Sequence, residues 1–293
     1  MMPLRSGTDM AVLLPAGGAL ARPVVDARAV GFTERTFSPA VLGALLALFA
    51  LAVAAAEAHG QPASAARAGI LATLWKWAPL LFSGFLFNLL VSVLSMALGT
   101  VAGLALGLAQ VSLLWPVRKG AGIVTQFFRN APWLVLLFYC MFLLPFDVAV
   151  FGITVPLPAW FKAVIGLALP VMANVSEIVR GGVRSIPIAQ WESAEALAFS
   201  RRQILWMVIL PQSLKRMLPP WMNLYAILTM ATTLISIVGI QDGMTLVRSA
   251  LIAEQRTELF IPMYLMLLTW FFLYCYPIAR LTMALERRFA VRA

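Results

Sequence analysis

Residues Gln190–Gln212 read QWESAEALAFSRRQILWMVILPQ, and the interpretation of the whole fold depends on this stretch. It holds two glutamates, two arginines and a proline, although the chain of 293 residues is 62% hydrophobic and only 12% charged. A soluble domain carries roughly 25% charged residues. The composition therefore indicates a polytopic membrane protein, and this stretch is a polar loop whose meaning depends on the side of the membrane where it lies.

Six apolar stretches are long enough to cross a membrane, since about 20 apolar residues in a helix span the hydrocarbon core. The second is too long for one crossing, so its first part, with Pro79 and Gly84, is interpreted as an interfacial helix that leads into the span. Its later half carries Gly99, Gly103 and Gly107 at four-residue spacing, which predicts close packing against another helix. The six stretches are Pro39–Ala56, Ala78–Leu114, Ile123–Leu144, Ala159–Ile178, Leu218–Ile240 and Leu259–Leu285.

The positions of Lys and Arg predict the orientation, because cytoplasmic loops carry an excess of both. With a cytoplasmic amino terminus, sixteen of the 22 basic residues fall in inner segments. The net charge of +10 is then explained by topology, and the basic residues form no single face or arm, which excludes a nucleic-acid partner. Both termini and the loop at Gln190–Gln212 are expected in the cytoplasm.

Local patterns in the loop predict two short helices joined by a bend. Residues Ala189–Leu197 are good helix formers, with Trp191, Ala194 and Ala198 on one apolar face. That face needs a partner, and the alternative is that it lies on the lipid surface.

The second helix begins at a capping-box pattern, in which Ser200 is followed three residues later by Gln203. Pro211 is expected to bend or end this helix, because proline lacks a backbone N–H and clashes with the preceding turn.

Three segments of the chain resemble the membrane subunits of ATP-binding-cassette importers of the polar amino-acid type, a likeness that extends from about Ala78 to Arg288. The most specific segment runs EIVRGGVRSIPIAQWESAEALAFSRRQILWMVILPQSLKRMLPP, from Glu177 to Pro220. The others are FFRNAPWLVLLFYCMFLLP, Phe127–Pro145, and NLYAILTMATTLISIVGI, Asn223–Ile240. The Glu-Ala-Ala, Gly and Ile-Leu-Pro positions of the family signature correspond to Glu192, Ser193, Ala194, Ala198, Ile209, Leu210 and Pro211.

The chain departs from the family pattern at a few positions. Ser193 replaces an alanine, and Ala198 replaces a glycine, which we interpret as a turn that is not left-handed. Met230 and Ala231 stand where Lys and Asp are common, which removes two charges from the fifth span and leaves the substrate open. The first span, Pro39–Ala56, lies outside the matched part.

The resemblance implies an all-α integral membrane protein with a five-helix importer permease core plus one N-terminal helix. The expected organisation is a cytoplasmic tail at 1–38, an additional transmembrane helix at 39–57, an external loop at 58–77, the permease domain at 78–288 with a coupling loop at 185–212, and a tail at 289–293. Within that loop, the resemblance implies contact with the ATPase through a coupling helix and its flanks, and the residues expected to take part are Trp191, Glu192, Ser193, Ala194, Leu197, Ala198 and Pro211.

The same resemblance implies the partners and the location. Two ATPase subunits would bind ATP and Mg, a second permease of identical or sister type would complete the path, and an extracytoplasmic binding protein would deliver an amino acid. The chain would lie in a bacterial inner membrane.

Polar side chains within the spans are candidates for the substrate path, since they are costly in lipid and should face the bundle interior. An amino-acid zwitterion would need both charges matched, for which Glu177 and Arg129 are the sharpest pair. Alternatively, Glu177 pairs with Arg180 three residues on, and Arg129 extends to the interface. The candidates are Asn88, Arg129, Asn130, Asn174, Glu177, Asn223, Thr232, Thr233 and Ser236.

No residue pattern indicates covalent chemistry, a metal site or a cofactor bound by this chain. The sequence has no Walker or Gly-x-Ser-x-Gly motif, and its one histidine, His59, is predicted in an outer loop. Cys140 and Cys275 lie in apolar runs without metal-ligand spacing. A channel or secondary transporter remains an alternative, although no internal repeat is visible. A membrane-embedded enzyme would need an intramembrane catalytic constellation, and Glu177 and His59 are far apart in the predicted topology.

Overall fold

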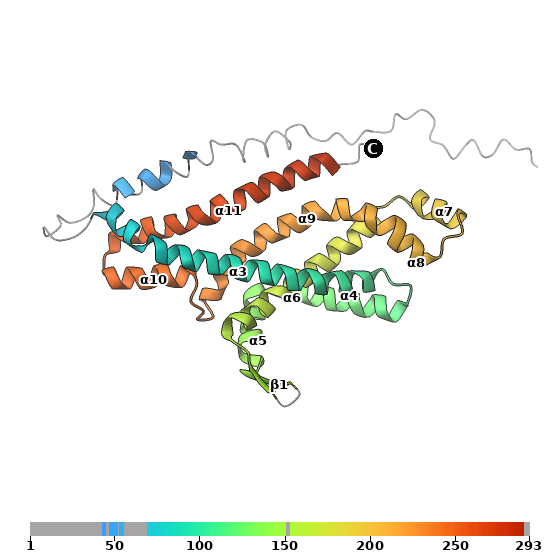
Figure 1. The fold of residues 1–293 in the computed structure, drawn as a ribbon, viewed down its shortest axis with the longest axis horizontal. Helices are drawn as coiled ribbons and strands as arrows, with labels where there is room; N and C mark the ends of the chain where they lie inside the picture. Colours follow the sequence, from blue (N-terminus) through green and yellow to red (C-terminus); the bar gives the residue numbers. More distant parts are fainter. Residues whose placement is uncertain (1–42, 45–46, 52, 56–68, 151–152, 290–293) are drawn as a thin grey trace, which may run out of the picture. The chain divides into compact units, whose positions relative to one another are not determined.

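The computed structural model describes residues 43–44, 47–51, 53–55, 69–150 and 153–289. Of the first predicted span, the described residues are helical, whereas the predicted tail at 1–38, most of the external loop and residues 290–293 lie outside the described part. The described part is helical apart from turns and one short hairpin (Figure 1). Among the described residues, three helical segments are long and apolar enough to cross a membrane, namely Ile70–Gln110, Ala159–Arg184 and Thr257–Arg287.

Among the described elements, α3 (Ile70–Gln110) and α6 (Ala159–Arg184) share the most extensive contact. A Cβ added at Gly99 would lie 2.5 Å from Cγ1 of Val171, and one at Gly107 would lie 2.6 Å from Cβ of Val179. The predicted close packing of the glycine-spaced face is therefore confirmed. The glycines allow the valine row of α6 to contact the α3 backbone directly.

Helix α3 is a single helix of 41 residues that passes through Pro79 and begins within the predicted external loop. The prediction of an interfacial helix before the span is therefore wrong. Its first half packs on α10 (Gly243–Glu254), a helix that the sequence patterns did not predict. Gly84 is buried there, where an added Cβ would lie 2.9 Å from the Gly243 backbone. Tertiary packing of this kind stabilises a helix across a single proline.

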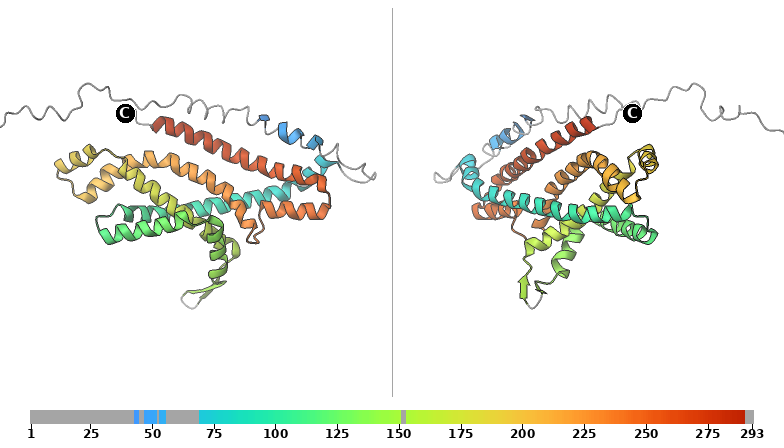
Figure 2. Two further views of the ribbon diagram at one scale, coloured as in Figure 1. Left: turned by 180° about the vertical axis from the view of Figure 1, so that it is seen from behind. Right: turned by 45° about the vertical axis from the view of Figure 1, so that its right-hand side comes forward.

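The predicted span Ile123–Leu144 is two helices, α4 (Trp115–Asn130) and α5 (Trp133–Leu143). Between them Ala131 is extended, with ψ of 135°, because the ring of Pro132 disfavours helical backbone at the preceding residue. Helix α5 turns away from α4 in both views of Figure 2.

A short antiparallel hairpin follows α5 and is the one exception to the all-α prediction in the described part. Strands β1 (Asp147–Val150) and β2 (Ile153–Pro156) pair in a register that places Asp147 opposite Pro156.

The loop after α6 folds as predicted into α7 (Ile188–Ala196) and a second helix. That second helix begins as α8 (Arg201–Gln203) and continues through a π-helical segment, η2 (Ile204–Ile209), into α9 (Leu210–Ala231). The prediction that Pro211 ends this helix is wrong, and a bend there stays a prediction. Pro211 has no backbone N–H and lies where the hydrogen-bonding pattern changes from π-helical to α-helical. The last π-helical bond runs from the Leu210 N–H to the Leu205 carbonyl.

The last part of the chain completes the bundle. Helix α9 ends at Ala231, nine residues before the end of the predicted span, and is followed by the 3₁₀ segment η3 (Thr232–Ser236). After α10, the short η4 (Thr257–Leu259) leads into α11 (Phe260–Phe289).

Candidate functional site

Helix α7 uses its apolar residues to attach to its own chain. Ala194 is only 4% exposed, and Trp191 packs against the same buried cluster of α6 and α9 residues. Of the predicted apolar face, Ala194 and part of Trp191 are therefore covered by this chain, whereas Ala198 is exposed. The outward surface of the α7 segment instead presents Glu192, Ser193 and Leu197, and Leu197 is 70% exposed.

The turn after α7 is left-handed at Ala198, where φ is 58°. The interpretation that this turn avoids the left-handed region is wrong. The Ala198 N–H donates to the Glu195 carbonyl at 2.9 Å, and the Phe199 N–H donates to the Ala194 carbonyl at 3.2 Å. These bonds close the helix end in the way that glycine usually permits, so alanine is held here in a strained backbone conformation.

The capping box at Ser200 is confirmed, and several contacts make α7, α8 and η2 one unit. The Gln203 N–H donates to Ser200 Oγ at 3.4 Å, and Gln203 Oε1 accepts from the Ser200 N–H at 2.9 Å. Ile204 and Ile209 are fully buried in the same cluster as Ala194. The helix that enters the bundle as α9 is thus fixed to α7 by packing.

A polar cavity of about 510 Å³ lies between α4, α6 and α9. It collects four of the predicted path residues, Arg129, Asn174, Glu177 and Asn223, and is completed by Ile178, Gly181, Gly182, Ser185, Arg216, Pro220, Leu224 and Ile227.

Glu177 is the electrostatic centre of this cavity, since its side chain is only 15% exposed and contacts two guanidinium groups. Arg129 Nη1 lies 3.4 Å from Glu177 Oε2, and Arg180 Nη2 donates to the same oxygen. The alternative pairing of Glu177 with Arg180 is therefore confirmed, while the role of Glu177 and Arg129 toward a substrate stays a prediction. Glu177 Oε1 is buried and has no hydrogen-bond partner among the described residues.

Two predicted path residues lie instead in a fully buried cluster beside α10. Asn88 Nδ2 donates to Thr232 Oγ1 and to Asp242 Oδ2, each at 3.2 Å, while Asn88 Oδ1 accepts from the Gly243 N–H at 2.9 Å. Asn88, Thr232 and Asp242 are all 0% exposed. These contacts join α3, η3 and α10.

The remaining predicted residues hydrogen-bond within their own helical segments. Asn130 donates to the Gln126 carbonyl at 2.7 Å, and Ser236 donates to the Thr233 carbonyl at 2.8 Å. Neither residue lines the polar cavity.

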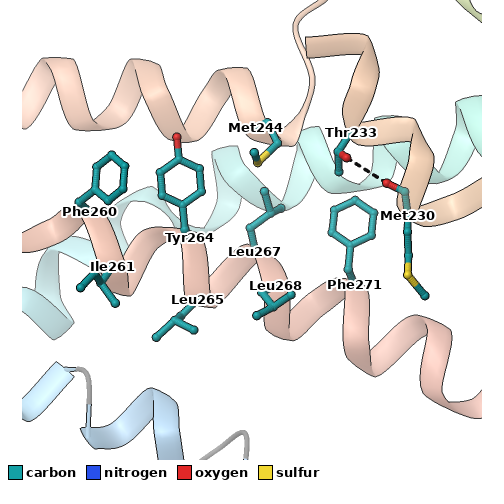
Figure 3. A pocket seen from close by; sticks show the side chains of 10 residues that line it. All are labelled: Met230, Thr233, Met244, Phe260, Ile261, Tyr264, Leu265, Leu267, Leu268 and Phe271. Atoms are coloured by element: carbon teal, nitrogen blue, oxygen red, sulfur yellow. Dashed lines mark hydrogen bonds between the residues drawn. The ribbon is translucent and has the colours of Figure 1, made fainter. Parts of the chain in front are cut away.

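Thr233 lines a different pocket, an apolar groove of about 560 Å³ beside α11 (Figure 3). Its hydroxyl donates to the Met230 carbonyl at 2.9 Å. The lining offers no charged side chain to a zwitterion, and consists of Met230, Thr233, Met244, Phe260, Ile261, Tyr264, Leu265, Leu267, Leu268 and Phe271.

Sequence reasoning missed Arg216 and Asp242. Arg216 was counted only as a topological charge, although its spacing from Asn223 places both on one face of a helix. Asp242 precedes Gly243 and accepts from the Thr245 N–H at 2.9 Å, an N-cap pattern that could have revealed α10.

Comparison with known proteins assigns the chain. Residues 95–291 match the family described as binding-protein-dependent transport system inner membrane component. The chain belongs to this family. It is therefore a multi-pass membrane transport subunit, which excludes the channel and secondary-transporter alternatives.

Individual relatives agree with this assignment. The permease is 32% identical to the probable amino-acid ABC transporter permease YckA of Bacillus subtilis, over 72% of this chain and 90% of the relative. It is 29% identical to the L-cystine transport system permease TcyB of the same organism, over 72% and 86% of the two chains.

Solved structures confirm the predicted importer-permease fold. A crystal structure of an amino acid ABC transporter with histidines superposes with a TM-score of 0.64 at 27% identity, over 76% of the permease and 99% of that chain. The inward-facing MetNI methionine ABC transporter superposes with a TM-score of 0.54 at 19% identity, over 72% and 98% of the chains, and supports the fold alone.

Proposed function

We propose that this permease is a subunit of an ATP-driven importer that carries an amino acid across a bacterial inner membrane. The observation that carries the proposal is the continuous helix Arg201–Ala231, which joins a surface element, α7, to the wall of a polar cavity. The relatives named as amino-acid and L-cystine permeases support an amino acid as the substrate. ATP and Mg would be bound by two partner ATPase subunits, and this chain would supply no catalytic residue.

The docking surface for the ATPase is the outward side of α7 and its following turn. Its exposed residues combine apolar and acidic groups, with Ile188 and Leu197 beside Glu192. Trp191 and Ala194 support this surface from within, and Ala198 and Pro211 shape the backbone on either side of α8. The orientation with both termini in the cytoplasm follows from the distribution of basic residues.

The polar cavity is the part of the path best suited to an amino acid. Arg129 can attract a carboxylate, and the Glu177 carboxylate can accept from an ammonium group. A second permease, identical or sister, would complete the path, and an extracytoplasmic binding protein would deliver the substrate from the other side.

Docking is tested by replacing Leu197 with arginine and measuring how much ATPase co-purifies with the permease. An Arg side chain in the centre of an interface should lower recovery by at least about tenfold. The matched control is Leu113→Arg, a similarly exposed leucine in the turn between α3 and α4, which should leave recovery unchanged. Equal recovery with both variants would contradict the proposed docking surface.

A further inference from the structure

The two ends of the coupling loop, residues 185–212, meet at the base of α9. Arg216 Nη1 donates to the carbonyl oxygen of Ser185, which is the C-cap residue of α6. Carbonyls in the last turn of a helix have no helical N–H partner, and the dipole there favours a cation. The bond is charge-assisted and therefore stronger than a bond between neutral groups.

A second and weaker contact lies one turn closer to the tip of the loop. Gln212 Nε2 donates to Gln190 Oε1 of α7 at 3.3 Å, on an exposed surface. Gln212 and Arg216 are four residues apart and so share one face of α9. That face is in contact with both α7 and the end of α6.

The same face of α9 continues into the polar cavity. Arg216, Pro220, Asn223 and Ile227 follow Gln212 at helical spacing, and all four line the cavity. Among the α9 residues of this face, Arg216 belongs to both parts, because its guanidinium group holds the base of the loop while its side chain forms cavity wall together with Arg129 and Glu177.

We infer that Arg216 is the positioning residue through which movement of the coupling loop reaches the cavity. By fixing Ser185 to α9, it makes the end of α6 and the cavity-facing side of α9 move together. Without it, α7 would still move with α9 through its packing on η2, but the end of α6 would no longer follow the cavity-facing side of α9. This inference rests on the proposed function and adds a residue that transmits the movement.

The test uses the assembled transporter in proteoliposomes with its binding protein and measures amino acid taken up per ATP hydrolysed. Arg216→Gln should leave ATPase recovery unchanged and lower this ratio about tenfold, the size of a typical coupling between two sites. The matched control is Lys215→Gln. Lys215 is exposed, carries the same charge and makes no hydrogen bond or ion pair within the described residues.

Arg216→Lys separates positioning from net charge. Lysine keeps the charge and can still donate but loses the planar fork, so about a fivefold loss in the ratio is expected, at the lower end of the range of such couplings. If the Arg216→Gln variant does not assemble, Arg216→Lys is compared with Lys215→Arg instead. An equal uptake per ATP hydrolysed in these two variants overturns the inference.

The outcomes also separate this inference from the proposed function. If no ATPase co-purifies with the unmodified permease, the proposed function fails. If the ATPase co-purifies and the ratio is the same for Arg216→Gln and Lys215→Gln, only the role of Arg216 is overturned.

Discussion

Gly103 of α3 lies so close to Val175 of α6 that an added Cβ would come within 2.6 Å of the valine Cβ. It would also lie 2.7 Å from the Met172 carbonyl oxygen, so the conflict is with backbone as well as side chain. Gly103→Ala should therefore destabilise the permease by about 2 kcal/mol through overpacking, net of the gain in helix propensity.

The measurement is the free energy of unfolding in mixed micelles. Gly120→Ala is the control, because a Cβ at that exposed position of α4 meets nothing within 4 Å. It should stabilise the protein by up to about 1 kcal/mol. Destabilisation of equal size in both variants would contradict the close packing of α3 on α6.

The strained turn at Ala198 gives a prediction of the opposite sign. Because φ is 58° there, Ala198→Gly should raise the free energy of unfolding by about 1 kcal/mol. Ala196→Gly, in the right-handed last turn of α7, should lower it by about 0.5 kcal/mol. Thermal unfolding of the purified permease checks both signs, and a loss of stability on Ala198→Gly would argue against the left-handed turn.

Glu177 balances two guanidinium groups in the cavity wall. Glu177→Gln leaves Arg129 and Arg180 facing each other without a carboxylate, and should cost about 2 kcal/mol of stability, since uncompensated charges in a partly buried site are unfavourable. The control is Glu195→Gln, which removes an exposed pair with Arg201 and should cost at most about 0.5 kcal/mol. Indistinguishable unfolding curves for the two variants would show that Glu177 contributes no more to stability than an exposed glutamate does.

Asn88 is the centre of the buried cluster beside α10. Asn88→Leu leaves Asp242 Oδ2 without that donor and leaves the Gly243 N–H without its acceptor, so a loss of about 3 kcal/mol is expected. Ser83→Ala on the same helix removes an exposed hydroxyl and should change stability by less than about 0.5 kcal/mol. The rate of amide hydrogen exchange in α10 should rise only in the Asn88 variant. An unchanged rate would contradict the role of the buried Asn88 cluster in holding α10.

The end of α10 provides a pH-dependent contact with the start of α3. Hydrogen bonds from Lys76 and Trp77 lower the pKa of the Glu254 carboxyl. Such a group stabilises the fold at pH values above its ordinary pKa, near 4.5, and the stabilisation is lost as the pH falls through the lowered value. Glu254→Gln should therefore lower the thermal midpoint at pH 7 and lose less on acidification than the unmodified chain.

Much of the candidate site could be predicted from local patterns. The α7 helix, the capping box at Ser200 and the glycine-spaced face of α3 depend on residues within about four positions of one another. Predictions from local patterns were wrong where contacts between distant parts of the chain determined the backbone conformation. Pro211 is accommodated by a π-helical segment anchored by buried isoleucines, and Ala198 is held left-handed by the packing on either side of it.

By itself, the sequence determined that this chain is a helical membrane protein with a charged loop of two short helices, because hydropathy, charge placement and caps are properties of short segments. Its resemblance to importer permeases indicated the family. Only the tertiary structure decided which polar groups meet. It brought Arg129, Glu177 and Arg216 to one cavity and placed Asn88 against Asp242. The physical reason is that such meetings depend on the rotation and mutual approach of whole helices, which are fixed by packing between residues far apart in the chain.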